Sequence, residues 1–592
     1  MVASAGCVAV GWPIWFHLIL CAVPVFLALR GRVGWTLAFA VTVTGLFAVV
    51  QLSLVLAARV HSGILVTVVV AATSAAVWAC LAPQAHSPVS RTPVPPRIVW
   101  LGALLGPLTW FLALGVGSLL TGGPRIAWTM RGDSANNLLI ARDLVTAGGI
   151  PTGADGNPAP LAPALLALGL VSGRRGGTGS LLQADIGSFA LVWLLVIALT
   201  CFVAGIVAAS LAVGGPIFVS IVAAAASLLP LSWFVSGYQI EFGFFNADIV
   251  IVIALLSWLA YVRFADSPAT ALTTLFVSGT VMLGCWGPLA VVPAVFALAL
   301  VLTRWSVIKR MRGAALTVVA LSLLQLIGYS VFVAIPPALA SGKALTAAGA
   351  IYVFEPFVPL VVVTVSVVLA IVRMLLLRDG RGSSVLLLAL GLAVSLGALL
   401  FLNRHGANPW TYYPVKCLWL GTVVLLIVTV GLVAGLLGGV SRRWLRAVAS
   451  AAVVVLAVGF LSSTQTVPTY RASSAVAHAL ADEEPFIDDA RLAAISQSLD
   501  GGGPIAYWRS GLPGEKYLNF WLLQMHAGLS QESFPIRVAA YGLGPSDTAS
   551  LCGLAEVLGP GLRVRTADAG LAGEIGQTCP SAAIEISVVP VR

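Results

Sequence analysis

Asp133 is the first carboxylate of this 592-residue chain, and it closes the sequence Trp128-Thr-Met-Arg-Gly-Asp133 directly after an apolar stretch. Only nine acids precede residue 464. Charged groups are costly at membrane depth, so the acids retained in such a region usually serve a function. One carboxylate within hydrogen-bonding reach of a hydroxyl can take its proton during a substitution. The sequence therefore predicts Asp133 as a general base.

A short polar segment after Asp133 has the pattern of an amphipathic helix. Apolar residues recur between Ala135 and Ala147, and Asn136 and Arg142 lie among the polar positions. Such a helix suits the membrane surface, and Asn136 and Arg142 are predicted to contact substrate. The alternative is structural, because Asp133 or Ser134 could serve merely as the N-cap.

A second polar segment runs from Asn403 to Lys416 and holds two cations, one histidine and three aromatic residues. Arg404 and Lys416 suit a lipid phosphate, with His405 beside them, and Tyr413 suits the face of a sugar. These four residues are predicted to bind substrate. The alternative is an interfacial aromatic belt with snorkelling cations.

A third polar segment has Glu241 and Asp248 on either side of an aromatic cluster. They are predicted to shape an acceptor site, with a divalent ion as an option. An ordinary solvated loop is the alternative.

The elements that must position these residues are membrane helices. Mean hydropathy is +1.01, and charged residues make up 9% of the chain, which excludes an ordinary soluble protein. Apolar runs of about twenty residues predict about fourteen spans: 9–29, 33–57, 62–83, 98–121, 186–212, 214–236, 247–264, 270–286, 287–303, 314–338, 355–377, 384–402, 414–438 and 445–463. The long loop 122–185 carries Asp133.

The distribution of charge predicts the orientation. With the N-terminus outside, 15 cations fall in one set of loops and nine in the other. The richer side is expected to be cytoplasmic. The loops that carry Asp133, Glu241 and Arg404 then share the extracytoplasmic face.

The composition changes near residue 464. Residues 464–592 hold 13 acids and eight cations, with ordinary soluble patterning that includes strand-like runs at Ile505–Trp508, Ile536–Tyr541 and Ala583–Val591. We expect a small extracytoplasmic α/β domain. Its two cysteines, Cys552 and Cys579, are expected to pair in an oxidising compartment. No cysteine spacing resembles a zinc site, and no metal or other cofactor is expected.

This arrangement resembles the GT-C glycosyltransferases, which use polyprenyl-phosphate-linked sugars. Leu101–Leu120 would be the helix that leads into the first large external loop, Asp133 its essential acid, and Asn136–Val145 its interfacial helix. The resemblance covers residues 98–463 and leaves residues 1–97 as extra N-terminal helices. Many members carry paired acids in this loop, whereas this chain has Asp133 and then Asp143 ten positions later. The external tail and the composition look most like actinobacterial cell-envelope arabinofuranosyl- and mannosyltransferases.

The resemblance implies an inverting glycosyltransferase in the cell membrane. Its partners would be a polyprenyl-phosphate sugar, a cell-wall glycan or glycolipid acceptor, and membrane lipids, and nucleic acid is not expected. Two alternatives stay open. An O-antigen-ligase or polymerase type of enzyme would depend on Arg404 and His405, and a transporter of lipid-linked glycans would carry ionisable residues inside its helices.

Overall fold

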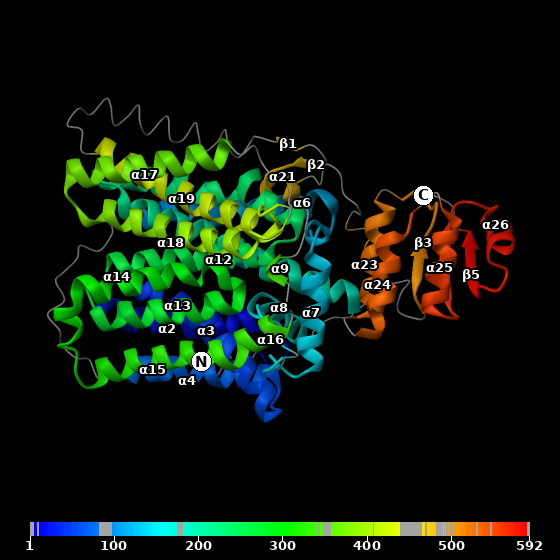
Figure 1. Cartoon of the computed structure of the whole chain (residues 1–592), viewed down its shortest axis with the longest axis horizontal. Helices are drawn as coiled ribbons and strands as arrows, with labels where there is room; N and C mark the ends of the chain where they lie inside the picture. The colour runs from blue at the N-terminus through cyan, green and yellow to red at the C-terminus, as the bar shows by residue number, and fades with distance from the viewer. Residues whose placement is uncertain are drawn as a thin grey trace.

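The chain is an α-helical, multi-pass membrane protein with a small C-terminal region that contains a few strands (Figure 1). The computed structural model describes residues 5–6, 8, 11–81, 97–154, 156–174, 181–340, 344–346, 357–406, 408–438, 465–467, 470–480, 489, 492, 495–496, 503–512, 514–528, 531–544 and 547–588. Within these residues, twelve helices are long and apolar enough to cross a membrane.

The expected number of about fourteen spans is not confirmed. The expected spans 270–286 and 287–303 fall in one apolar segment of 41 residues, Pro268–Ile308. That segment contains two helices that pack against each other, with a 3-10 turn at Gly287–Ala290 between them. Proline in a helix removes a backbone donor, and Pro288 lies in this turn. The expected span 445–463 lies outside the described residues.

Ten helices build the first part of the bundle and the long loop within it. They are α2 (Ile14–Val33), α3 (Trp35–Val60), α4 (Ile64–Leu81), α5 (Arg97–Ala103), α6 (Leu105–Thr121), α7 (Ser134–Thr146), α8 (Leu161–Gly173), α9 (Leu181–Leu211), α10 (Pro216–Leu228) and α11 (Tyr238–Phe242). Short 3-10 turns lie at η1 (Ala127–Thr129) and η2 (Leu229–Leu231), and a π-helical turn, η3 (Trp233–Gly237), leads into α11.

The second part of the bundle follows. It comprises α12 (Phe245–Val262), α13 (Pro268–Trp286), η4 (Gly287–Ala290), α14 (Val291–Ile308), α15 (Ala314–Tyr329), η5 (Ser330–Ala334), α16 (Ile335–Ala340), η6 (Ala344–Thr346), α17 (Phe357–Leu377), α18 (Gly380–Leu402) and α19 (Tyr412–Gly438). The amphipathic helix expected after Asp133 is present as α7. It lies across one end of the long helices (Figure 1), and we call this the α7 end.

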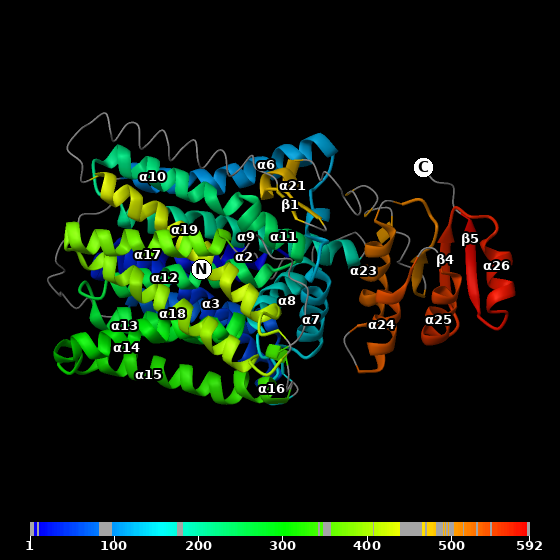
Figure 2. The same ribbon diagram turned by 45° about the horizontal axis from the view of Figure 1, so that its top comes forward.

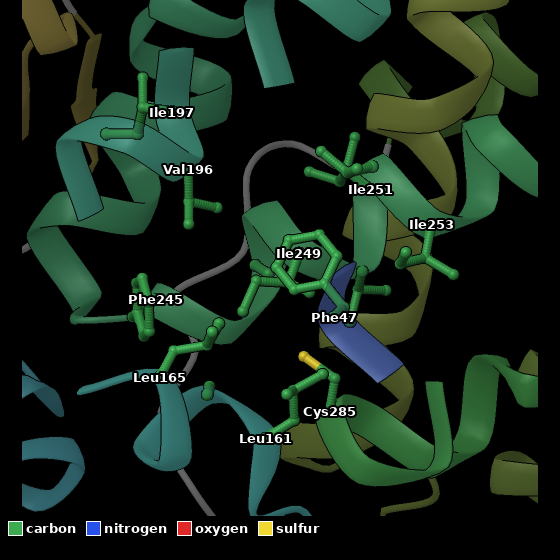
Figure 3. Packing of buried hydrophobic residues seen from close by; sticks show 14 of the residues in the cluster. Phe47, Leu161, Leu165, Val196, Ile197, Phe245, Ile249, Ile251, Ile253 and Cys285 are labelled. Carbon is green, nitrogen blue, oxygen red and sulfur yellow. The ribbon is translucent and has the colours of Figure 1, made fainter. Parts of the chain in front are cut away.

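The long loop also contains a buried apolar helix that the sequence did not predict. Every residue of α8 from Leu161 to Leu170 is buried, and α8 packs against α7 and α9. Leu161 and Leu165 lie among Phe47, Phe245 and Cys285 (Figure 3). With 13 residues, α8 is too short to span a bilayer. It therefore fills the core between α7 and α9 and so supports α7.

The C-terminal region begins with the antiparallel strands β1 (Gln465–Val467) and β2 (Tyr470–Ala472). A three-stranded parallel sheet follows, in the order β3 (Ile505–Tyr507), β4 (Leu562–Thr566), β5 (Ile584–Val588). Five helices accompany the strands: α21 (Ala475–Leu480), α23 (Glu515–Ala527), α24 (Phe534–Gly542), α25 (Thr548–Leu558) and α26 (Leu571–Thr578). A 3-10 turn, η7 (Gln531–Ser533), precedes α24.

One of the expected strands is wrong, because residues 536–541 form part of helix α24. A short apolar run does not distinguish strand from helix, and here Ala539 and Ala540 pack into the core of the sheet. The strands expected at Ile505 and Ala583 are present as β3 and β5. A disulfide joins Cys552 to Cys579, as the sequence predicted.

The C-terminal region lies at the α7 end of the bundle, with α23 and α24 next to α7 (Figure 2). Asp489 ties it to the start of the long loop. Its carboxylate accepts hydrogen bonds from the Arg125 guanidinium and from the N–H groups of Ile126 and Ala127, each at 2.7 Å. The Arg125–Asp489 ion pair is almost fully buried. Breaking a buried pair typically costs about 3–5 kcal/mol, so this contact anchors the region firmly.

The fold permits a direct test of the predicted orientation. The turn between α14 and α15 lies at the opposite end of the bundle from α7 and the C-terminal region (Figure 1). Arg310→Cys and Lys516→Cys, each made in a Cys7→Ser, Cys80→Ser background, add one exposed thiol at either end, and the free cysteines that remain, Cys21, Cys201, Cys285 and Cys417, are buried. In intact cells we expect an impermeant thiol reagent to label only the Lys516→Cys protein. Equal labelling of both before permeabilisation would contradict the model.

Candidate functional site

Two tight turns interlock to hold Asp133 in place. The Asp133 N–H donates to the Phe242 carbonyl at 2.8 Å. Gly132 has a φ of +48° and Gly243 a φ of +69°, conformations that favour glycine. A Cβ on Gly132 would overlap the Phe242 backbone, and one on Gly243 would overlap the backbone of Arg131, Asp133 and Ser134. The turn before α7 and the turn before α12 therefore fit together only through these two glycines.

The Asp133 carboxylate is not used as a helix cap. Asp133 occupies the N-cap position of α7, but its side chain makes no capping hydrogen bond. It instead accepts one from the Asn136 side-chain amide at 3.4 Å, and Asp133 is an exposed residue. The carboxylate is thus held in a fixed direction and stays open to an incoming hydroxyl group.

Lys416 is a buried cation in the first turns of α19, and only 4% of its surface is exposed. Its ammonium donates to Asn246 Oδ1 at 3.2 Å and to the Tyr412 hydroxyl at 3.4 Å. It also lies 3.8 Å from the centre of the Phe244 ring. We call Asp133, Lys416, Tyr412 and Tyr413 the Asp133–Lys416 cluster, because the charge of Asp133 acts on the other three.

The environment changes the acidity of Asp133. Asp133 keeps part of its surface in contact with solvent, but the protein packed around its carboxyl removes water from the other side. This desolvation raises the pKa of the Asp133 carboxyl above its ordinary value, while the Lys416 charge and the Asn136 hydrogen bond lower that pKa in part. A carboxylate works best as a general base when its pKa lies near the working pH. The net upward direction therefore suits proton abstraction, and Lys416 helps to keep the group ionised.

Aromatic rings surround the cluster. Tyr413 lies parallel to Trp286, with 6.3 Å between the ring centroids, and Tyr412 meets Tyr413 edge-on at 5.1 Å. Tyr412 also meets Phe244 edge-on. Tyr412 and Tyr413 are each partly buried. Rings with one accessible side suit a ligand that has both apolar and polar faces.

The structure places Glu241 beside the cluster in a structural role. Glu241 forms an ion pair with Arg131 at 2.5 Å, and 12% of the Glu241 side chain is exposed. This ion pair links the turn before α7, which contains Gly132, to the segment before α12, which contains Gly243. Glu241 therefore helps to hold the Asp133 turn.

Asp248 lies inside the bundle, fully buried in α12. It accepts a hydrogen bond from Trp193 Nε1 at 3.1 Å, and the Gln239 amide faces both of its carboxylate oxygens. In the described residues, no group of three or more His, Cys, Asp or Glu side chains is arranged to hold a metal ion. Asp248 thus stabilises helix packing in this structure.

Arg142 is part of a buried ionic group. Its guanidinium lies 2.7 Å from Asp185, which also pairs with Arg174 at 2.7 Å, and the Asp185 side chain is fully buried. Arg142 donates as well to the Met525 carbonyl of α23 at 3.3 Å. These contacts link α7 to α9 and to the C-terminal region, so Arg142 fixes the position of α7.

Arg404 and His405 are exposed in the turn after α18. Arg404 donates to the Phe401 carbonyl at 2.7 Å, and its guanidinium lies 3.7 Å from the centre of the Phe401 ring. Asn403 is buried and accepts from Thr411 at 3.1 Å. Arg404 is therefore held against its own helix end, whereas the charge of Lys416 acts on Asp133.

Sequence reasoning missed several residues of the cluster. Phe244 and Asn246 position Lys416, and Trp286 faces Tyr413, although none of them was predicted to do so. The available signal was the run Gly243-Phe-Phe-Asn246, which places glycine and a small polar residue in an aromatic segment. The contact between the Gly132 and Gly243 turns was harder to predict, because a single glycine in a sequence does not show which other segment packs against it.

An apolar cavity of about 440 Å³ lies between α3, the loop after α7 and the α15–η5 segment. It is lined by Leu52, Val55, Arg59, Thr152, Gln325, Gly328, Tyr329, Phe332 and Val333. The Gly153 N–H donates to the Phe332 carbonyl at 3.3 Å, which connects the cavity wall to the α7–α8 loop. The volume falls in the usual range for sites that bind small molecules.

Comparison of the chain with protein-family models, with curated proteins and with solved structures finds no match.

Proposed function

We propose that this protein transfers a sugar from a polyprenyl-phosphate-linked donor to a cell-envelope glycan or glycolipid on the extracytoplasmic face. Asp133 is the general base. The observation that carries the proposal is the Asp133–Lys416 cluster, in which the charge of a buried cation flanked by aromatic rings acts on the exposed residue Asp133 in a multi-pass membrane protein. The resemblance of the loop 122–185 to that of GT-C enzymes supports the same reading.

The proposed reaction is an inverting displacement. The acceptor hydroxyl oxygen bonds to the anomeric carbon, its proton moves to Asp133, and the bond from that carbon to the phosphate oxygen breaks, so that the polyprenyl phosphate leaves with the electron pair. Double displacement would need a second, nucleophilic carboxylate about 5 Å from the first. Glu241 pairs with Arg131, and Asp248 is buried in the bundle and bonded to Trp193, which favours the single-base route.

The leaving phosphate needs positive charge near it. We assign this task to Arg404 together with Lys416, with His405 in support. Lys416 also acts on Asp133, since it lowers the pKa of that carboxyl. Tyr413, stacked on Trp286, is proposed to face a sugar ring.

The apolar cavity supports a lipid-linked donor. Its wall includes Thr152, six residues after the end of α7, and the exposed cation Arg59 at the end of α3. An apolar chain buries its surface favourably in such a space, while a phosphate would favour the neighbourhood of a cation. The cavity is thus suited to part of a polyprenyl chain.

The proposal is tested with membranes that contain the protein. Transfer of radiolabelled sugar from polyprenyl phosphate to a glycan acceptor is measured, with nucleotide sugars as the comparison donor. We expect product only with the lipid-linked donor. Transfer that survives Asp133→Asn but is lost with Arg404→Ala and with His405→Ala would favour a ligase-type enzyme. Movement of intact lipid-linked glycan across vesicles, without transfer, would indicate a transporter.

Lys416→Met should shift the pH dependence of transfer. The Lys416 charge lowers the pKa of Asp133, so its removal raises that pKa further. Because the base must be ionised, the acidic limb of kcat/KM is expected to move to higher pH. The Asn136 amide still donates to Asp133 in this variant.

The matched control is Lys516→Met, which removes an exposed lysine from α23 and should leave the profile unchanged. An acidic limb in the same place for Lys416→Met and wild type would show that Lys416 does not act on the base.

A further inference from the structure

One of the polar contacts between the C-terminal region and α7 leads to Asp133. Arg537, in α24, donates from Nη2 to Asn136 Oδ1 at 3.0 Å. Asn136 in turn donates from Nδ2 to Asp133 Oδ1 at 3.4 Å. Three residues from two distant parts of the chain therefore form one continuous series of donors and acceptors.

The direction of this series follows from the chemistry of its members. A guanidinium group only donates hydrogen bonds, and an ionised carboxylate only accepts them. An asparagine between the two must turn its oxygen to the arginine and its amino group to the carboxylate. Without the arginine, the amide has no such constraint, and rotation by 180° would present its oxygen to Asp133.

We propose that Arg537 is a positioning residue, through which the C-terminal region orients the Asn136 amide toward Asp133 and so supports the ionised form of that carboxylate. The inference rests on the proposed function only where it speaks of catalysis. Its structural part concerns the state of Asp133 in the protein without substrate.

Neighbouring contacts make this role specific. Arg142 and Met525 join α7 to α23 independently, so the C-terminal region stays attached when Arg537 is changed. Arg537 also acts electrostatically on Asp143 of the same helix, where its charge lowers a pKa that burial raises. Lys416, Tyr412 and Tyr413, which interact electrostatically with Asp133, lie on α19. In the described hydrogen bonds none of the three contacts Arg537.

The test measures the protonation of Asp133 directly. A water-soluble carbodiimide reacts with protonated carboxyl groups, and peptide mass spectrometry follows the modification of Asp133 across a pH series in the full-length protein. Arg537→Met and Asn136→Leu are each expected to move the titration of Asp133 to higher pH, with severalfold more labelling near neutral pH. Arg537→Lys keeps a group that only donates and should restore the wild-type curve.

Arg563→Met is the matched control, because Arg563 donates to the Gly503 carbonyl within the C-terminal region and is remote from α7 in sequence and contacts. It should leave the titration of Asp133 unchanged. Thermal unfolding of every variant confirms that the fold is intact.

The outcomes separate the two proposals. A shift with Asn136→Leu but none with Arg537→Met would overturn the role of Arg537, and no shift with either would overturn the whole series. A shift in both variants, restored by Arg537→Lys, supports the inference even if no sugar transfer is found, in which case the proposed function alone fails. If transfer is found, the same variants should move the acidic limb of its pH profile in the same direction.

Discussion

Asp133→Asn should lower the rate of sugar transfer by about two to four orders of magnitude, the usual cost of losing a general base. Asparagine keeps the size of the side chain but has no basic carboxylate oxygen. The Asn136 amide, which donates to Asp133 at 3.4 Å, loses a charged acceptor. Donor binding should change little, because the cations assigned to the phosphate are untouched. The measurement is initial rate against donor concentration in membranes or in detergent.

The same variant should fold normally. Replacement of a capping residue typically costs about 1 kcal/mol, but the Asp133 side chain makes no capping hydrogen bond. We therefore expect a smaller effect on the free energy of unfolding. Near-normal transfer by a folded Asp133→Asn protein would rule out the general-base role.

Asp143→Asn is the matched control for Asp133→Asn. Asp143 is also an exposed carboxylate of α7, and it lies three turns further along the helix. Its replacement changes the charge of the same helix by the same amount. Transfer should stay close to the wild-type rate, and an equal loss in both variants would point to a general effect of charge on α7.

Gly243→Ala should reduce transfer by about two orders of magnitude, because a displacement of about 1 Å at a catalytic group has an effect of that size. The new Cβ would overlap the backbone of Arg131, Asp133 and Ser134. A backbone neighbour cannot rotate away as a side chain does, so the turn that carries Asp133 must move. We expect the helical bundle to persist, as measured by circular dichroism, while kcat falls.

Gly148→Ala is the control that distinguishes the steric overlap at Gly243 from the strain of placing alanine in a left-handed conformation. Gly148 has a φ of +71° and Gly243 a φ of +69°, but no atom lies within 4 Å of a Cβ added at Gly148. Both variants therefore bear a similar conformational cost, about 1–2 kcal/mol for a left-handed residue. Only Gly243→Ala should lose transfer. Equal loss in both proteins would mean that strain alone is responsible and that the interlocked turns do not position Asp133.

Sequence patterns predicted the elements that are set by neighbouring residues: the spanning helices, α7 and the C-terminal region. Apolar runs predict spanning helices because each backbone group in a membrane must be bonded within its own helix. The polar spacing after Asp133 predicted α7, and the change in composition near residue 464 marked the C-terminal region. The disulfide between Cys552 and Cys579 could be predicted because the C-terminal region contains only these two cysteines. The short helix α8 escaped notice because it is shorter than a span and lies in a segment expected to be a loop.

Asp133 itself was found from sequence because a lone acid after 132 residues without one is conspicuous. By sequence alone, Asp248 and Glu241 were equally good candidates for substrate contact, and the structure instead gives both of them protein partners. Sequence alone also paired Lys416 with Arg404, which lies in the same loop. The two residues are only twelve positions apart in the chain, but the fold separates their roles. Lys416 is a buried cation that acts on Asp133, whereas Arg404 is exposed and held against Phe401.

The sequence by itself thus determined a multi-pass helical protein, the location of its polar segments and the identity of its most conspicuous carboxylate. Only the tertiary structure decided which polar groups pair: Glu241 with Arg131, Arg142 with Asp185, and Asn136 with Arg537. It also brought Lys416 to a position from which its charge acts on Asp133. The physical reason is that helix formation depends on hydrogen bonds between residues four apart. The partner of a charged group depends instead on how helices far apart in the chain pack, and on glycines such as Gly132 and Gly243 that let two backbones meet.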